Sequence, residues 1–340
     1  MKIIKPIILI LLSIICFGFI SETFQHDKIE PYVLKLPEGF PEPVIPENNQ
    51  LTKERIELGR RLFYDPILSV DSSISCASCH NQSLGFADNR AISPGVEGRL
   101  AMRNAPTLTN VAYNPTLLFD GFLKTLEMQV LVPIEEHAEF ANNIVEISEK
   151  LANDSLYSNL SRQAYNREID PFVITRSISS FERTLISGNS KFDQQAYQGK
   201  NVMDRSEKRG MNLFFNELEC ASCHSGFNFT NFSTQNNGLY KVYTDTGRMR
   251  VTKLEQDRAM FKVPTLRNIE LTAPYMHDGS IATLEEVVDH YQTGGKNHPN
   301  KSDKLKPFQL SKKEKHDLVN FLKCLTDTDF INNPDFKSPF

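Results

Sequence analysis

The sequence predicts a mainly α-helical protein built from two related domains. The pentapeptide Cys-Ala-Ser-Cys-His occurs twice, at residues 76–80 and 220–224. Other motifs recur with a constant offset of 158 residues, which indicates an internal duplication. Between these motifs, apolar residues follow helical spacing, and the alternating patterns typical of strands are minor.

The composition is that of a globular protein with enough apolar residues for a sizeable core. The 340 residues are 40% hydrophobic and carry a formal net charge of −4, and this length suits about two domains. The absence of a basic excess argues against nucleic acid as a partner. No internal stretch is apolar for 18 residues, so a polytopic membrane protein is excluded.

The N-terminus has the features of an export signal. Lys2 and Lys5 precede an apolar run of 14 residues, from Ile7 to Ile20. This run is short for a transmembrane helix, so residues 1–21 are predicted to be a signal peptide or an uncleaved N-terminal anchor. Either interpretation places the rest of the chain in the periplasm. Residues 22–50 are rich in proline and predict an extended segment.

The repeated pentapeptide is the attachment signature of c-type haem. Two thiols at this spacing reach the two vinyl groups of a porphyrin, and the following histidine supplies an axial ligand to the iron. A shared zinc site is the alternative, but the two motifs are 144 residues apart and each ends in histidine. We therefore expect two cytochrome c-like helical domains, each wrapping one covalently attached haem c. The attachment residues are Cys76, Cys79, Cys220 and Cys223, with His80 and His224 as proximal ligands.

The duplication extends beyond the haem motifs. A glycine-containing segment at 59–63 also resembles residues 210–214. The motifs that share the 158-residue offset are Ala105–Asn110 with Val263–Asn268, Asp120-Gly121 with Asp278-Gly279, and Thr125–Glu127 with Thr283–Glu285. We therefore place an N-terminal domain at 51–200, a C-terminal domain at 201–327 and a C-terminal tail at 328–340.

Helices are predicted where apolar residues recur at helical spacing or where a capping box is present. Thr283 and Ser311 each precede a glutamate by three residues, which is typical of a helix N-terminus. Polar residues at 189–203 suggest an interdomain linker, and residues 227–262 suggest a long loop. The helices predicted from apolar spacing are 51–64, 144–151, 173–186 and 206–215.

The sixth ligand of each iron decides the function. A haem with both axial positions filled transfers electrons, whereas an open position can bind peroxide. For the first haem, Met102 and Met128 lie at usable distances after the motif. For the second haem, spacing alone leaves several candidates open: Met276, His277, His290, Tyr291 and His298.

The sequence resembles the bacterial di-haem cytochrome c peroxidase family, which includes MauG-like proteins. The resemblance covers roughly residues 50–325. It rests on both Cys-x-x-Cys-His motifs, Arg103–Thr107, Phe119–Gly121 and Leu271–Gly279. It implies that the N-terminal haem is the peroxidatic centre and that the C-terminal haem transfers electrons.

The resemblance also implies two catalytic residues, Gln129 and Glu139. A carboxylate above an open iron can move a proton between the two peroxide oxygens, and an amide can orient the peroxide. The residues alone give Glu139 no special status, because Glu135 and Glu136 are close by and all three fit a solvated helix end.

Three departures from the family pattern change what we expect. Val96 stands where many members have a distal histidine, so the first haem should be open in every redox state without reductive activation. Phe119 replaces the tryptophan between the haems, so a tryptophan relay cannot be assumed. Electron-transfer members have methionine at the position of Tyr291, and a tyrosine there resembles MauG. We favour Tyr291 over His290, His298 and Met276 as the sixth ligand of the second haem.

The family further implies a calcium ion between the domains. Its ligands would be the Asn104 side chain and the backbone carbonyls of Thr272 and Pro274, a donor set that suits Ca²⁺. The residues alone do not predict this site, since Asn104 fits a turn before Ala-Pro equally well.

We therefore expect a peroxidase that reduces hydrogen peroxide to water with electrons from a small cytochrome c or cupredoxin. One alternative is a MauG-like enzyme that uses peroxide-derived oxidising equivalents to oxidise a partner protein. A second is a non-catalytic di-haem electron carrier, which requires a sixth ligand such as Met128 on the first haem. The family also suggests a homodimer.

Overall fold

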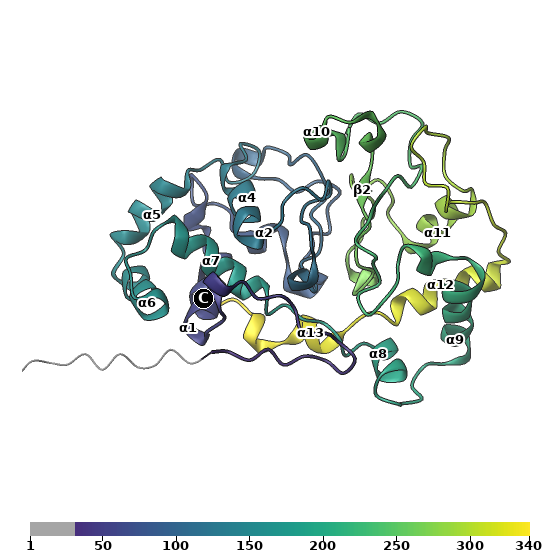
Figure 1. The fold of residues 1–340 in the computed structure, drawn as a ribbon, viewed down its shortest axis with the longest axis horizontal. Coiled ribbons are helices and arrows are strands. Elements are labelled where there is room, and N and C mark those ends of the chain that lie inside the picture. Colours follow the sequence, from purple (N-terminus) through teal and green to yellow (C-terminus); the bar gives the residue numbers. More distant parts are fainter. Residues whose placement is uncertain (1–30) are drawn as a thin grey trace, which may run out of the picture.

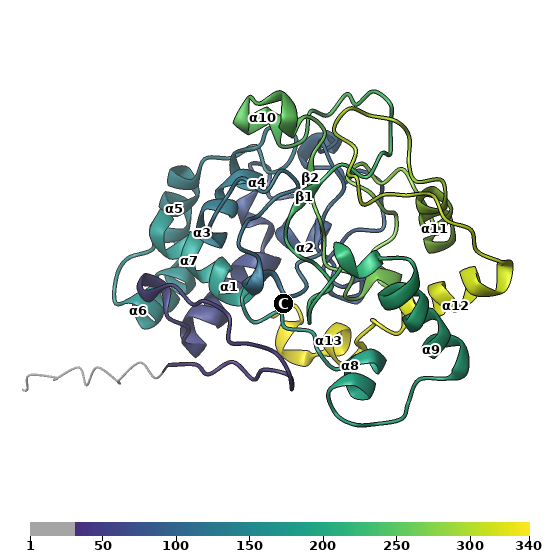
Figure 2. The same ribbon diagram turned by 45° about the vertical axis from the view of Figure 1, so that its right-hand side comes forward.

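Two large hydrophobic clusters organise residues 31–340, which are the residues that the computed structural model describes. They form two lobes that lie side by side in Figures 1 and 2. The predicted signal peptide or anchor at 1–21, and the first part of the proline-rich segment, lie outside the described residues. The described part of that segment is mostly extended up to a short 3-10 turn at Glu47–Asn49. No helix among residues 31–340 is both long and apolar enough to span a bilayer.

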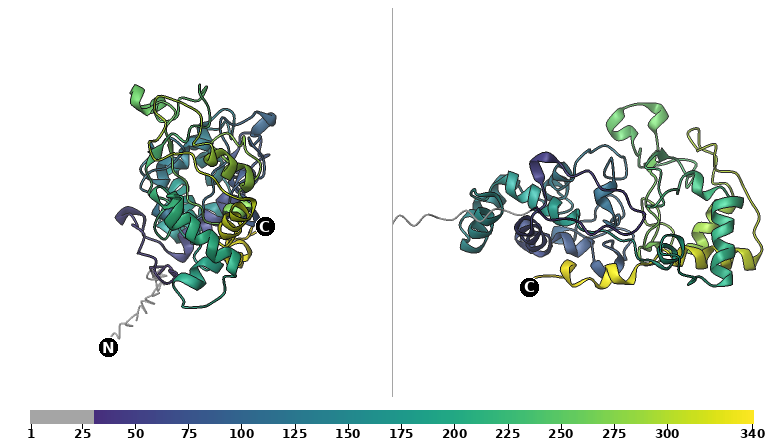
Figure 3. Two further views of the ribbon diagram at one scale, coloured as in Figure 1. Left: turned by 90° about the vertical axis from the view of Figure 1, so that its right-hand side faces the viewer. Right: turned by 60° about the horizontal axis from the view of Figure 1, so that its bottom comes forward.

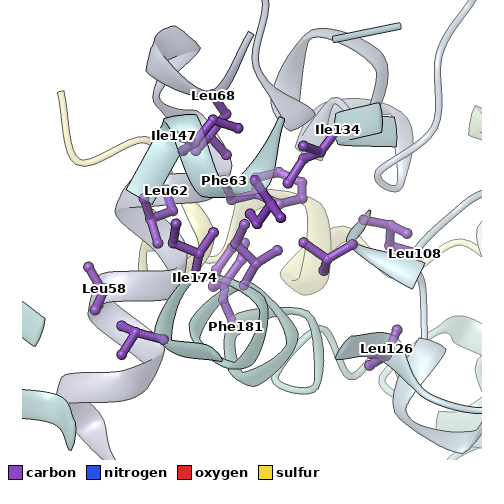
Figure 4. Close-up of a cluster of buried hydrophobic side chains, with 14 of the residues drawn as sticks. Leu58, Leu62, Phe63, Leu68, Leu108, Leu126, Ile134, Ile147, Ile174 and Phe181 are labelled. Atoms are coloured by element: carbon purple, nitrogen blue, oxygen red, sulfur yellow. The ribbon is translucent and has the colours of Figure 1, made fainter. Parts of the chain in front are cut away.

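The first lobe is built around two crossing helices, α1 (Lys53–Tyr64) and α7 (Pro171–Glu182). Leu62, Phe63 and Phe181 are fully buried at this crossing and are shown in Figure 4. At Gly59, a Cβ atom would lie only 1.8 Å from the carbonyl oxygen of Ser177. The helices can approach this closely only because that position is glycine. The remaining helices of this lobe are α2 (Cys76–Cys79), α3 (Leu126–Gln129), α4 (Leu131–Glu135), α5 (Ile144–Ala152) and α6 (Ser155–Tyr165).

The second lobe repeats this crossing with α9 (Arg205–Asn212) and α12 (Lys312–Lys323). A Cβ atom at Gly210 would lie 1.9 Å from the carbonyl oxygen of Asp317. Gly59 and Gly210 belong to the segments that the sequence pairs, so the repeated glycine has the same packing role in both halves. The other helices here are α8 (Lys191–Ala196), α10 (Met249–Thr252) and α11 (Leu284–Gln292).

The capping boxes predicted at Thr283 and Ser311 are confirmed at the starts of α11 and α12. The helix predicted at 173–186 ends earlier than expected, at Glu182, and continues as turns. The helix predicted at 206–215 changes to a π-helical turn, Leu213–Glu217, just before the second Cys-x-x-Cys-His motif.

The two polar segments are more structured than the sequence suggests. Residues 189–203 contain α8, whose N-terminus is closed by a capping box between Ser190 and Asp193. Residues 227–262 include two short antiparallel strands, β1 (Thr234–Gln235) and β2 (Phe261–Lys262). The described residues nevertheless form a mainly helical fold, as predicted.

The segment predicted as a C-terminal tail is part of the first core. It contains α13 (Thr328–Asn332) and runs back beneath the first lobe, as the yellow ribbon shows in Figures 1 and 3. Phe330 and Phe336 are buried in the first hydrophobic cluster. The hydroxyl of Tyr64 on α1 donates to the carbonyl oxygen of Phe336 at 2.7 Å. The end of the chain therefore ties the second lobe to the first.

Candidate active site and haem-binding motifs

The first Cys-x-x-Cys-His motif forms the single turn of α2, capped by Ser75. The Nδ1–H group of His80 donates to the carbonyl oxygen of Phe86 at 3.0 Å. This bond fixes the ring and leaves the Nε2 lone pair free for a metal. Burial lowers the pKa of His80, which favours the neutral ring that a metal needs.

A cavity lies against this motif. The cavity has a volume of about 50 Å³ and is partly open to solvent. Gln129 at the end of α3 and Glu139 in the turn after α4 both line it. The structure therefore brings both candidate catalytic residues to the space beside the proximal histidine. The lining residues that carry the argument are Cys76, Cys79, His80, Gln129, Glu139 and Glu182.

Backbone hydrogen bonds hold Glu139 in place. The N–H of the buried Val96 donates to the carbonyl oxygen of Glu139 at 3.0 Å, and the N–H of Glu139 donates to that of Glu136 at 2.9 Å. Burial raises the pKa of the Glu139 carboxyl to about 6, and the nearby charge of Glu136 adds to this shift. Glu135 and Glu136 do not line the cavity, which distinguishes Glu139 from its two neighbours.

The two methionines considered for the first iron lie at the surface. The Met102 side chain is 67% exposed and that of Met128 is 52% exposed. Met128 lines a separate surface hollow beside Pro171 and Phe172, and it is not among the residues that line the cavity.

Glu182 was not predicted from the sequence. It is buried at the end of α7 and lines the cavity, and its Oε2 atom has no hydrogen-bond partner in the described chain. Burial raises the pKa of this carboxyl to about 8. An acidic residue at the end of an otherwise apolar helical stretch is the only sequence signal for it.

The second motif forms a 3-10 turn, Cys220–Ser222, but its histidine makes the same kind of hydrogen bond as His80. The Nδ1–H of His224 donates to the carbonyl oxygen of Phe229 at 3.1 Å, again leaving Nε2 free. Tyr291 on α11 lies near Cys220 and Cys223. Burial raises the pKa of the Tyr291 phenol to about 12, while a hydrogen bond with the Asn237 side chain opposes the increase.

The other candidate ligands of the second iron have protein partners. Asn237 also donates its side-chain N–H to the Met276 sulfur at 3.2 Å, so Met276 and Tyr291 share one neighbour. His290 donates from Nε2 to the carbonyl oxygen of Asn237 at 3.0 Å. Nδ1 of His298 accepts a hydrogen bond from the backbone N–H of Asn300 at 3.1 Å.

The predicted inter-lobe residues lie where the two lobes meet. The N–H of Asn104 donates to the carbonyl oxygen of His277 at 2.9 Å, which brings it to the segment that contains Thr272 and Pro274. The carbonyl oxygen of Phe119 accepts a hydrogen bond from the N–H of Lys262 at 2.7 Å. No group of three or more His, Cys, Asp or Glu side chains forms a metal site among residues 31–340. The proposed calcium donors are an amide side chain and two backbone carbonyls, which are not groups of this kind. The calcium site therefore stays a prediction.

The residues present fit covalently attached haem. In the first lobe, two unpaired thiols and a histidine with a free Nε2 line one cavity. In the second lobe, two unpaired thiols, an equivalent histidine and a partly buried phenol come together. Thiols, imidazole and phenol are the donor groups that attach and ligate such a group.

Comparisons with known proteins agree with these motifs. The family model described as di-haem cytochrome c peroxidase matches residues 53–201. The chain is 38% identical over 318 residues to the methylamine utilization protein MauG of Methylorubrum extorquens, covering 91% of this chain and 89% of that protein. It is 40% identical over 302 residues to cytochrome c551 peroxidase of Nitrosomonas europaea, covering 87% and 84%.

A solved structure is also similar. The crystal structure of a MauG-like protein associated with microbial copper homeostasis has a TM-score of 0.86 and 34% identity. The match covers 91% of this chain and 99% of that one.

Proposed function

The chain belongs to the di-haem cytochrome c peroxidase family and is an oxidoreductase of that type, and we propose that it reduces hydrogen peroxide at the haem on Cys76 and Cys79. The reaction takes two electrons and two protons and gives two water molecules. A small cytochrome c or cupredoxin would supply the electrons. The observation that carries the proposal is the cavity that Gln129 and Glu139 share with His80.

The haem, when bound, would supply the iron at which peroxide is cleaved. The Glu139 carboxylate would accept a proton from one peroxide oxygen and return it to the other, the one that leaves as water. With its pKa raised to about 6, the carboxyl is mostly ionised at neutral pH yet basic enough to hold the proton. The Gln129 amide orients the peroxide by hydrogen bonding.

The second haem, on Cys220 and Cys223, would pass electrons to the first. We propose Tyr291 as its sixth ligand, supported by the position of the phenol near both thiols. An anionic oxygen donor favours the oxidised iron and lowers the potential. Phe119 is hard to oxidise, so electron transfer between the haems would not use that side chain as a relay.

Further parts of the proposal come from the family resemblance and the N-terminal sequence. A calcium ion held by Asn104, Thr272 and Pro274 would link the lobes. The charged, apolar start of the chain supports a periplasmic location, with or without an N-terminal anchor. A homodimer is part of the same proposal.

A second candidate function is the oxidation of a partner protein. The similarity to MauG, the MauG-like structure and the placement of Tyr291 favour it. Phe119 weakens the analogy, because the inter-haem tryptophan of the family is missing.

Spectra and turnover test both functions. The resting ferric protein should contain a high-spin first haem whose spectrum changes when peroxide is added. Two low-spin haems that do not react with peroxide would contradict both functions. Fast peroxide-dependent oxidation of a reduced cytochrome c would support the first function, whereas a peroxide-reactive protein without that turnover would point to the second.

A further inference from the structure

The two lobes meet through a reciprocal pair of backbone hydrogen bonds. The N–H of Asn104 donates to the carbonyl oxygen of His277, and the N–H of Lys262 donates to that of Phe119. The two donors, Asn104 and Lys262, are 158 residues apart, and so are the two acceptors, Phe119 and His277. This is the offset of the duplication. Lys262 therefore occupies, in the second lobe, the position that Asn104 occupies in the first.

The Lys262 side chain lacks a counter-charge. Its ammonium has no hydrogen bond or ion pair with any residue between 31 and 340. Burial alone lowers its pKa to about 8, and no neighbouring carboxylate contributes to the shift. Lys262 is partly buried, and an ammonium that loses part of its hydration without gaining a partner is unfavourable, so this position favours an anion beside it.

Two acidic groups of the interface accept hydrogen bonds from arginine side chains, although Oδ1 of Asp120 has no partner among residues 31–340. Asp120 accepts hydrogen bonds from Arg103 at 3.2 Å and from Arg250 at 2.9 Å. Asp245 accepts a bidentate pair from Arg103, at 2.6 and 3.0 Å. Neither carboxylate is bonded to the Lys262 ammonium, so the described residues supply no bonded anion for it.

Lys262 lies close in sequence to the proximal side of the second haem site. The backbone of Pro264, two residues later, is close enough to His224 to affect the pKa of its ring. Lys262, the last residue of β2, therefore lies in the segment that approaches the proximal histidine. A haem attached at Cys220 and Cys223 would carry two propionate carboxylates, which are candidate anions for this ammonium.

We propose that Lys262 binds a carboxylate at the interface between the lobes, and that this carboxylate is a propionate of the second haem. In this arrangement the position that the two halves share is a neutral amide in the first half, Asn104, and a cation in the second half, Lys262. The inference rests on the second covalent haem of the proposed function, but it does not depend on peroxide chemistry.

The test measures the midpoint potentials of both haems in the complete, haem-loaded protein by spectroelectrochemistry. Lys262→Met removes the charge at similar length, Lys262→Arg keeps it, and Lys241→Met removes an exposed lysine of the same lobe. A cation beside a propionate stabilises the reduced haem. We expect Lys262→Met to lower the equilibrium constant for reduction of the second haem by on the order of tenfold. Lys262→Arg and Lys241→Met should leave it close to the wild-type value.

Haem content, measured as the pyridine haemochrome, separates failure of this inference from failure of the proposed function. A protein with two haems whose potentials are unchanged by Lys262→Met would overturn the inference, as would a shift confined to the first haem. Acetate is the probe for the other source of carboxylate. A saturable acetate effect on the wild-type potentials that disappears in Lys262→Met would show a solution anion in place of the propionate. If Lys262→Met does not fold, Lys262→Gln replaces it with the same expectation.

Discussion

Asp193 and Arg267 form a bidentate ion pair that is closed off from solvent. Both Nη atoms of Arg267 donate to the Asp193 carboxylate at 2.8 Å, and the two side chains are 0% and 1% exposed. Arg267 lies in the segment that follows β2, and Asp193 lies on α8, within the stretch whose composition suggested a linker. The pair therefore anchors α8 against the core of the second haem site.

Breaking this pair should destabilise the protein strongly. Asp193→Asn preserves the side-chain shape but leaves the buried Arg267 charge uncompensated, which should cost about 3–5 kcal/mol. Urea unfolding of the haem-loaded protein, followed by circular dichroism, measures the change. The control is Glu168→Gln, which breaks the exposed pair with Arg162 and should have no measurable effect. Equal effects of the two variants would show that burial of the pair is unimportant.

Replacing Glu139 should impair peroxide cleavage selectively. Glu139→Gln keeps the size of the side chain but removes the base, so the cleavage rate should fall by about 10²–10⁴-fold. Stopped-flow absorbance after mixing with peroxide measures this rate, and haem content should not change. Glu135→Gln alters a neighbouring acid that does not line the cavity and should retain the wild-type rate. Wild-type kinetics in Glu139→Gln would remove this residue from the mechanism.

The pH dependence should follow the ionisation of Glu139. The folded-state pKa is raised to about 6, and the active form is the carboxylate, so the cleavage rate should rise with pH through about 6 and then level off. Glu136→Gln removes a like charge that contributes to the raised pKa and should move the midpoint to lower pH. Glu135→Gln is again the control. A profile that falls with increasing pH across this range would contradict the assignment.

Tyr291→Phe should change the second haem. Losing the phenol oxygen removes the proposed anionic ligand, so the ferric spectrum should change and the midpoint potential should rise. Electron paramagnetic resonance and visible spectra of the ferric protein measure this. His290→Gln and His298→Gln serve as controls and should keep the wild-type signal. If one of them alters the signal and Tyr291→Phe does not, that histidine is the ligand.

What the sequence predicted well is local. The capping boxes at Thr283 and Ser311 depend only on residues three apart, so they can be predicted from the local sequence. The glycines at 59 and 210 repeat because each half needs the same close helix crossing. The mainly helical class followed from the same local patterns.

What the sequence could not predict depends on distant segments. Glu182 reaches the cavity from a helix about 100 residues after His80, and the sequence near it does not indicate that it lines the site. Phe330 and Phe336 enter the first core only because the chain returns from the second lobe. Glu139 stood out from Glu135 and Glu136 only through the family resemblance. The position of Lys262 could in principle be predicted from the sequence, since the 158-residue offset pairs it with Asn104.

Met128→Leu tests whether the first iron has a protein ligand on its far side. Met128 is half-exposed and faces a surface hollow, so it should not reach the iron of a haem held by His80. We therefore expect Met128→Leu to keep the ferric spectrum of the first haem and its response to peroxide, as should Met102→Leu. Magnetic circular dichroism of the ferric protein would reveal the alternative. A first haem that is low-spin in the wild type and becomes high-spin in Met128→Leu would require a methionine ligand, and the protein would then transfer electrons without reducing peroxide at that centre.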